Sequence, residues 1–465
     1  MLSLLIRSWR SWAKAKSIAG LAILALAIGI GCATAVFTVV NSVMLNPLPY
    51  RDSSRWVALF GGSTLEPTRY SALNLAELKD YQQRTHSFDV FGWYKISGDF
   101  NLNSSGVVEH IAGAEVTPSL LEGVGVNPLA GRLFRDSDGP RVALISSRLW
   151  RQLGSDGSIE GKPIALDGRS YTIVGVLPGW FQLPIVSVGN ENLHNEVWIP
   201  IDPNEARENT GAYAVYARMK PGVTIPAARA DAKSVANGIA KENNRLATYT
   251  ATLFGLQDFV VKEVRPFLFL LMGAAGVLLL ITCANVGGLL VARSVHRSQE
   301  IAVRVALGAQ KRQLIQQFLT EGLFISLLAA ALGVLASIGL TRLFLGLAAD
   351  YIPRSEEVSI SPTVLLFAAG LVFLTALLPA LAPLRQAART QPTEVLTSGV
   401  RASGGIRSRR ISNFLVIAEI AFAFLLLSAG GLLVAELYTL QHAWPGFDVN
   451  HLMAFQIDAP EGQFS

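Results

Sequence analysis

Cysteine and charged residues are scarce in this chain of 465 residues, which holds two cysteines and is 16% charged. Cys32 and Cys283 both lie inside long apolar runs, where a thiol behaves as a small hydrophobe, so no disulfide framework is expected. The sequence also lacks a G-x-x-x-x-G-K-[ST] phosphate loop. No serine or cysteine sits in a nucleophile motif, and His86, His110 and His194 are too scattered for a metal site. We therefore expect no catalytic residue, metal or cofactor in this chain.

Apolar residues are abundant, at 51%, and they gather in five long runs. A helix needs about 20 mostly apolar residues to cross a bilayer. Transmembrane helices are therefore predicted at residues 17–44, 263–292, 314–347, 362–384 and 412–440. The predicted fold class is membrane α-helical, with about five transmembrane helices and a large mixed α/β extracytoplasmic domain between the first two.

Arginine and lysine in the short loops predict the orientation. The basic segments, expected in the cytoplasm, are residues 1–16, 293–313 and 385–411. The loop 348–361 sets Arg354 against three acidic residues, which fits the outside, and the long segment 45–262 is then also outside. We expect a multi-pass protein of a bacterial inner membrane with a cytoplasmic N-terminus. Because the basic residues flank predicted spans, the net charge of +5 does not indicate nucleic-acid binding.

The N-terminal segment 1–16 has Leu5, Trp9 and Trp12 on one helical face, which predicts an interfacial helix. Two other interpretations were a cleaved signal peptide and a lipoprotein anchored through Cys32. The first apolar run is longer than a signal-peptide core, and Gly29 stands where a lipoprotein signal has an aliphatic residue.

Residues 45–262 are predicted to form the outer domain, because β-branched and aromatic runs alternate with helical stretches and turn signals. The predicted strands include Trp56–Phe60, Ser170–Val176, Glu196–Ile201 and Ala212–Met219, and the predicted helices are Leu75–Gln83, Ser147–Leu153 and Ala227–Asn243. Asp167-Gly168 between two apolar runs predicts a hairpin. We interpret the domain as a binding or force-receiving module.

The cytoplasmic segment 293–313 combines charge with helical periodicity. Its polar stripe consists of Arg293, Arg297, Glu300 and Arg304, spaced by four, three and four residues. This spacing predicts one face of a short helix, which Gly308 then ends. A charged helix between two membrane spans is suited to bind a soluble partner protein. The alternative is a juxtamembrane helix that only satisfies the charge rule.

Residues 300–333, EIAVRVALGAQKRQLIQQFLTEGLFISLLAAALG, resemble the signature of the MacB/FtsX family of ABC transporter permeases. Residues 21–59 resemble the first span and the start of the outer domain in its duplicated-permease, ADOP-like branch. The resemblance implies a MacB-like periplasmic core domain at 45–262 and an FtsX-like permease domain at 263–384. It also implies a coupling helix that docks on an ATPase subunit. The residues to which it gives this role are Glu300, Arg304, Leu307, Gly308 and Ala309, with Lys311 and Arg312 beside them.

The implied function is that of a permease subunit. A separate ATPase chain, which would hold ATP and Mg, drives conformational work on the extracytoplasmic side for efflux or an envelope process. The implied partners are this ATPase, a second permease module or a second copy of the chain, membrane lipid, and an envelope protein on the outer domain. The alternative is a membrane-anchored envelope sensor or scaffold without transport activity. A secondary carrier is disfavoured because the span centres lack ionisable residues.

The tail 441–465 repeats features of the outer domain's start. WPGFDVNHLMAFQI follows the fifth span as PLPYRDSSRWVALF follows the first, so a second, truncated module is predicted from near Ile411. A gene fragment, a split gene and assembly with a second polypeptide all remain open.

Two further expectations concern the interior of the helical part. Glu321, near the start of span three, is expected to pair with a cytoplasmic arginine. Close helix packing is predicted at Gly273, Gly276, Gly287, Gly288, Gly322 and Gly333.

Overall fold

The computed structural model describes residues 16–442, except 67, 96–98, 105–106, 136, 155–158, 184–194, 202–211, 243–247, 297–310, 349–351, 353 and 390–405. The chain divides into two compact units. The helical unit comprises Met1–Ser42, Pro266–Leu347 and Val358–Phe455, and the outer unit comprises Val43–Arg265, Ala348–Glu357 and Gln456–Ser465. Residues 1–15 of the predicted interfacial helix (1–16) lie outside the described residues, as does the part beyond 442 of the second module predicted from near Ile411.

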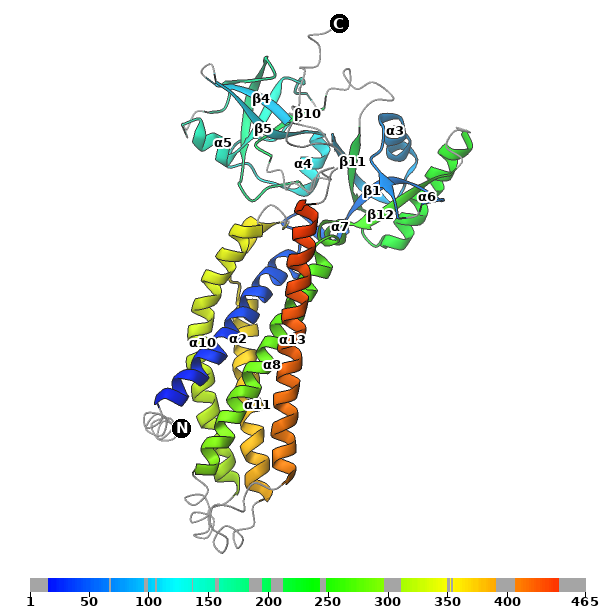
Figure 1. Ribbon diagram of the computed structural model, residues 1–465. Coiled ribbons are helices and arrows are strands. Elements are labelled where there is room, and N and C mark those ends of the chain that lie inside the picture. The colour runs from blue at the N-terminus through cyan, green and yellow to red at the C-terminus, as the bar shows by residue number, and fades with distance from the viewer. Residues whose placement is uncertain are drawn as a thin grey trace, which may run out of the picture. The chain divides into compact units, whose positions relative to one another are not determined.

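The long helices account for the helical unit (Figure 1). They are α2 (Lys16–Val40), α8 (Arg265–His296), α10 (Lys311–Ala348), α11 (Pro362–Arg389) and α13 (Ile406–His442), and α2 continues into the π-helical turn η1 (Asn41–Leu45). Among the residues that the structure describes, three helices are long and apolar enough to cross a membrane, over Ser17–Leu45, Arg265–Leu289 and Thr320–Leu347, and they coincide with predicted spans one to three. The apolar stretches Pro362–Leu377 and Ile420–Glu436 are shorter, so the count of five spans stays a prediction.

Small residues on α10 let this helix approach α2 and α11 closely. A Cβ atom on Gly333 would lie 2.9 Å from the Ala27 carbonyl oxygen, and one on Gly322 would lie 3.0 Å from the Ala376 carbonyl oxygen. Packing at these two glycines is therefore confirmed. The same prediction is wrong within this chain for Gly273, Gly276 and Gly288, which face open space. The helical periodicity gave no sign of which face α8 turns toward the other spans.

The core of the helical unit is built from the facing stripes of α2, α8, α10 and α11. Ala22, Leu26 and Ile30 recur every four residues on α2 and are almost wholly buried, as one face of a helix requires. Glu321 is also buried, at 4% exposure. Near the outer end of α2, the Asn41 amide nitrogen donates a hydrogen bond to the Ser361 hydroxyl at 3.1 Å.

The outer unit is a single mixed sheet with short helices. Its strands are β1 (Trp56–Ser63), β2 (Tyr70–Ser71), β3 (Phe88–Lys95), β4 (Asp99–Ser104), β5 (Val107–Val116), β6 (Ala130–Gly131), β7 (Val142–Ser146), β8 (Pro163–Leu166), β9 (Arg169–Leu177), β10 (Val197–Pro200), β11 (Tyr213–Met219) and β12 (Tyr249–Gly255). Its helices are α3 (Leu75–Arg84), α4 (Pro118–Val124), α5 (Ser147–Gln152), α6 (Ile225–Glu242) and α7 (Leu256–Val261), with 3₁₀ turns η2 (Ser53–Arg55) and η5 (Ser355–Glu357).

The strand order is β10-β7-β9-β8-β4-β5-β3-β11-β1-β12. An additional parallel pairing of β10 with β5 closes the strands β5-β4-β8-β9-β7-β10 into a ring, which surrounds its own apolar core. The remaining strands β3, β11, β1 and β12 extend as an open sheet, with α3 and α6 covering one face (Figure 1). The outer unit therefore has a closed lobe and an open lobe that share β5.

The open lobe shows why its strands form where they do. On β1, Val57 and Leu59 point into the core beneath α3 and α6, whereas Trp56, Ala58 and Phe60 point into the core on the opposite face. Alternate side chains of a strand face opposite sides, so an uninterrupted apolar run makes a strand covered on both faces.

The predicted strands and helices of the outer domain are confirmed with boundaries that differ by up to three residues. The hairpin at Asp167-Gly168 joins β8 to β9, and both residues have positive φ, 48° and 73°, as its turn requires. Asp167 also accepts hydrogen bonds from the Asn101 backbone and side-chain nitrogens at 2.9 and 3.0 Å. The hairpin is thereby tied to β4.

Candidate functional site

The predicted ATPase-docking residues fall mainly outside the described residues. Glu300, Arg304, Leu307, Gly308 and Ala309 all lie in the undescribed segment 297–310. Lys311 and Arg312 form the first turn of α10. On the other side, α8 continues as a helix to His296, beyond the predicted span end at residue 292. The docking role of these residues stays a prediction.

The best-defined polar site in the described residues is the point where the first span passes into the outer unit. After η1 the chain reads Asn46-Pro47-Leu48-Pro49-Tyr50. The prolines have no N–H and cannot continue a helix. The last carbonyl groups of a helix lack partners within it, so donors from elsewhere are needed here.

Two side chains from distant parts of the sequence supply these donors. The Arg354 guanidinium donates to the carbonyl oxygens of Asn46 at 2.9 Å and Pro47 at 3.0 Å. The Gln257 amide donates to the carbonyl oxygens of Met44 at 2.7 Å and Asn46 at 3.2 Å. We call these five residues the span-one joint. A cation at the carboxyl end of a helix also meets the negative end of the helix dipole.

Arg354 is held in place from its other side. Its guanidinium contacts both carboxylate oxygens of Glu357, at 3.2 Å from Nε and 2.6 Å from Nη2. The Arg354 side chain is only 9% exposed, so its charge is largely removed from water and depends on these partners. The Arg354 backbone has φ of 62°, a left-handed conformation that costs a non-glycine residue about 1 kcal/mol or more. The surrounding contacts therefore outweigh a local strain.

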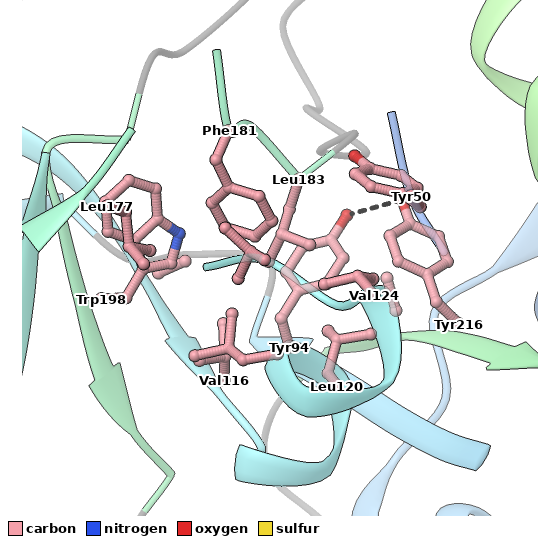
Figure 2. Packing of buried hydrophobic residues seen from close by; sticks show 14 of the residues in the cluster. Tyr50, Tyr94, Val116, Leu120, Val124, Leu177, Phe181, Leu183, Trp198 and Tyr216 are labelled. Carbon is pink, nitrogen blue, oxygen red and sulfur yellow. Dashed lines mark hydrogen bonds between the residues drawn. The ribbon is translucent and has the colours of Figure 1, made fainter. Parts of the chain in front are cut away.

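The chain beyond the joint enters the outer unit through a buried tyrosine. The Tyr50 hydroxyl donates to the Gln182 carbonyl oxygen at 2.5 Å, and its ring packs edge-on against Phe181. Burial raises the pKa of Tyr50 well above its ordinary value; the Glu357 carboxylate acts in the same direction and Arg354 opposes it. Figure 2 shows Tyr50 beside Tyr94 and Tyr216 in the core shared by both lobes.

An ion cluster then fixes the start of β1. Asp89 accepts hydrogen bonds from Arg55 at 2.5 Å and from Arg218 at 2.9 Å. Arg55 also donates to the Met219 carbonyl oxygen at 2.7 Å. Partial burial alone would raise the pKa of Asp89, but its hydrogen bonds to Arg218 and Arg55 lower it overall. The first strand is thus bonded to β3 and β11 directly after the joint.

The sequence gave little indication of the joint. Arg354 was noted only as one charge in the loop between spans three and four, and Gln257 was not singled out. The structure assigns the segment Ala348–Glu357 to the outer unit. Only an arginine next to two glutamates in an otherwise short loop could have drawn attention to it. The arrangement has no nucleophile or acid–base pair; it bonds three chain segments of the outer unit to one another.

Two family models match the chain. The MacB-like periplasmic core domain matches residues 19–235, and the FtsX-like permease C-terminal domain matches residues 272–392. The chain is 24% identical to the macrolide export ATP-binding/permease protein MacB of Chromobacterium violaceum, over 55% of this chain and 38% of that protein. It is 27% identical to the uncharacterized ABC transporter permease YvrN of Bacillus subtilis, over 55% of this chain and 62% of that protein.

A solved structure, the periplasmic region of MacB from Actinobacillus actinomycetemcomitans, is 11% identical. It covers 46% of this chain and 94% of its own, with a TM-score of 0.35. The chain spans less than two thirds of the length of both curated relatives. Of the joint residues, Met44, Asn46 and Pro47 lie within the first matched range and Arg354 lies within the second, whereas Gln257 falls between the two.

Proposed function

Because this chain belongs to the MacB/FtsX-type family of ABC transporter permeases, we propose that it couples ATP hydrolysis by a separate ATPase to conformational work on the outer domain. It is a multi-pass protein of the inner membrane, and the proposed orientation places its N-terminus in the cytoplasm. The observation that carries the proposal is the presence, in one chain, of an FtsX-like permease domain and a MacB-like outer domain.

The span-one joint supports mechanical coupling in particular. A displacement is passed on only where the connection is stiffer than its surroundings. The Asn46 carbonyl oxygen accepts from both Arg354 and Gln257, so two chain segments are fastened to the same atom. The bond from Arg354 is charge-assisted, which is the stronger class of hydrogen bond in proteins. These bonds fasten the stretch Met44–Pro47, at the end of span one, within the outer unit.

The ATPase is proposed to be another polypeptide, because the sequence has no phosphate loop. It would dock on the segment 293–313, with the stripe of Glu300 and Arg304 presenting charge of both signs. A second permease module or a second copy of this chain would complete the transporter. The efflux or envelope process it serves is proposed only as a class of work on the extracytoplasmic side.

A pull-down from native membranes tests this function. The intact chain is compared with a Glu300→Lys, Arg304→Glu double variant that reverses the stripe. A matched control, Arg84→Glu with Glu242→Lys, reverses an exposed pair of the outer unit whose atoms are 2.9 Å apart. The intact chain and the control are expected to recover an ATP-binding subunit, and the stripe variant is expected to lose it.

Two results would argue against the proposal. Recovery of the same ATPase by the stripe variant would show that these residues do not dock it. Recovery of no ATPase by the intact chain would contradict the transporter function itself and favour the membrane-anchored sensor or scaffold.

A further inference from the structure

A cluster of partly exposed aromatic rings lies on the open lobe of the outer unit. The rings of Tyr70, Phe254 and Phe259 meet pairwise, with centroids between 5.7 and 6.1 Å apart. Beneath them the buried Phe60 ring lies 4.9 Å from both Tyr70 and Phe259. These residues come from β1, β2, β12 and α7, which adjoin one another in the lobe (Figure 1). The sheet therefore presents a fixed aromatic surface rather than scattered side chains.

A lysine stands over this surface. The Lys262 ammonium nitrogen lies 5.0 Å from the centroid of Tyr70 and 5.3 Å from that of Phe254, within the range of cation–π attraction. Among the described residues, no carboxylate lies within 4.0 Å of this ammonium group. The nearby Asp258 carboxylate pairs instead with Arg265 at 2.5 Å. We call Tyr70, Phe254, Phe259 and Lys262 the Lys262 patch. Its positive charge lies over two rings, and no described carboxylate forms an ion pair with it.

One acidic residue, Glu263, directly follows Lys262 in the chain. Partial burial raises the pKa of Tyr70, and the charge of Glu263 raises it further. Both side chains are exposed, and the Lys262 ammonium group lies over two rings. The patch thus keeps an apolar body with a cationic tip.

The chain places this patch close to a bilayer surface. The membrane-spanning stretch Arg265–Leu289 begins three residues after Lys262. Three residues extend at most about 10 Å, so Lys262 cannot lie far from the start of the span. Aromatic rings combined with lysine are the side chains enriched where proteins pass from bilayer to water, because one end is apolar and the other is hydrated.

We propose that the Lys262 patch binds the phospholipid head-group layer at the extracytoplasmic surface of the membrane. Lys262 would meet the lipid phosphates, and the exposed parts of the Tyr70 and Phe254 rings would lie against the glycerol and upper acyl region. The charge complementarity and the short chain connection to the span select lipid over a protein partner. This surface is independent of the ATPase and would anchor the open lobe in any nucleotide state.

Fluorescence quenching of the full chain in lipid nanodiscs tests the proposal. Both native cysteines are replaced, as Cys32→Ala and Cys283→Ala, and one probe is attached through Thr68→Cys, an exposed position two residues before Tyr70. The matched control carries the probe through Val108→Cys, which is 64% exposed on β5. A nitroxide on the lipid head group is expected to quench the probe at residue 68 and to leave the probe at residue 108 bright. Equal quenching of the two probes would overturn the proposal.

Substitutions in the patch then separate lipid binding from simple proximity. In nanodiscs of equal parts phosphatidylcholine and phosphatidylglycerol, Lys262→Gln is expected to lower the ratio of quenched to unquenched probe at residue 68 about fivefold. Lys262→Arg keeps the charge and should retain the quenching, and Lys241→Gln on the exposed face of α6 serves as the control substitution. Quenching that is unchanged in both Lys262→Gln and a Tyr70→Ala, Phe254→Ala variant would mean that the spans alone set the position. That result would refute lipid binding by the patch.

Discussion

Replacing Arg354 by methionine tests how firmly the outer end of span one is held. The substitution keeps much of the apolar stem but removes two hydrogen bonds to backbone oxygens, at 2.9 and 3.0 Å, and leaves Glu357 without its cation. Hydrogen bonds to charged groups contribute about 1.5–3 kcal/mol each, and breaking a buried ion pair costs about 3–5 kcal/mol. Because the Glu357 side chain is 25% exposed, we discount the combined cost to about 2–4 kcal/mol.

Hydrogen–deuterium exchange of the full chain in nanodiscs measures this cost locally. A loss of about 3 kcal/mol raises the open population about 100-fold, so peptides that cover Val43–Tyr50 should exchange about 100-fold faster. Peptides from the closed lobe should keep their protection. Arg354→Gly provides a comparison, because glycine relieves the left-handed strain and should be milder than methionine by about 1 kcal/mol.

A second variant separates the two parts of the effect. Glu357→Gln in the Arg354→Met background removes the orphaned carboxylate and should restore part of the protection. Unchanged exchange at Val43–Tyr50 in Arg354→Met would refute the assignment of a stiff joint. Equal loss of protection throughout the outer unit would also refute it, because a general loss of stability would then explain the result.

Three other substitutions have defined outcomes. Gly333→Leu should destabilise the helical unit by about 1–3 kcal/mol, because the first added atom would lie 2.9 Å from the Ala27 carbonyl oxygen. Gly339→Leu should not destabilise it, because an added Cβ atom at residue 339 has nothing within 4 Å. Equal melting temperatures of the two variants in detergent would contradict this prediction. The pKa of Asp89 in the folded protein is below its ordinary value of 3.8. Asp89 therefore contributes its full stabilisation above pH 3.8 and loses it as the pH falls through the folded pKa. In Asp89→Asn, the unfolding free energy should depend less on pH in this acid range. Asn74→Ala removes the side-chain acceptor of the α3 capping box, to which the Glu77 backbone N–H donates, and should lower the unfolding free energy in urea by about 1 kcal/mol; an unchanged midpoint would contradict it.

The parts of the fold that follow local rules were predictable from the sequence. The turn at Asp167-Gly168 needs two positive φ angles, and the residue pair itself indicates this. The strand β1 was predicted because its apolar run is continuous. By contrast, β3, β4 and β5 mix apolar and polar residues and were not predicted individually. Their pairing depends on partners far along the chain, such as Tyr213 of β11 opposite Lys95 of β3.

The glycines of the predicted spans also show what the sequence alone could not predict. A glycine in a predicted span indicates that another helix can pack closely there, but the sequence does not indicate which helix does so. Gly31 on α2 was not singled out, yet a Cβ atom there would lie 3.0 Å from the Gly333 carbonyl oxygen. Gly273 was singled out and faces open space. The contact face of a membrane helix is set by its neighbours, because lipid and helix surfaces are equally apolar.

The span-one joint forms because the backbone carbonyl oxygens at the end of span one need hydrogen-bond donors. A helix that ends before Pro47 and Pro49 leaves carbonyl oxygens that the next residues cannot satisfy, since proline lacks the N–H. In this chain the donors are Gln257, which lies shortly before span two, and Arg354, which lies between spans three and four. The segments that lead to every predicted span of the permease domain are therefore bonded to the end of span one. Under the proposed function, the loop at Arg354 would be a transmitting element, and weakening it should uncouple ATP hydrolysis from movement of the outer unit without abolishing ATPase docking.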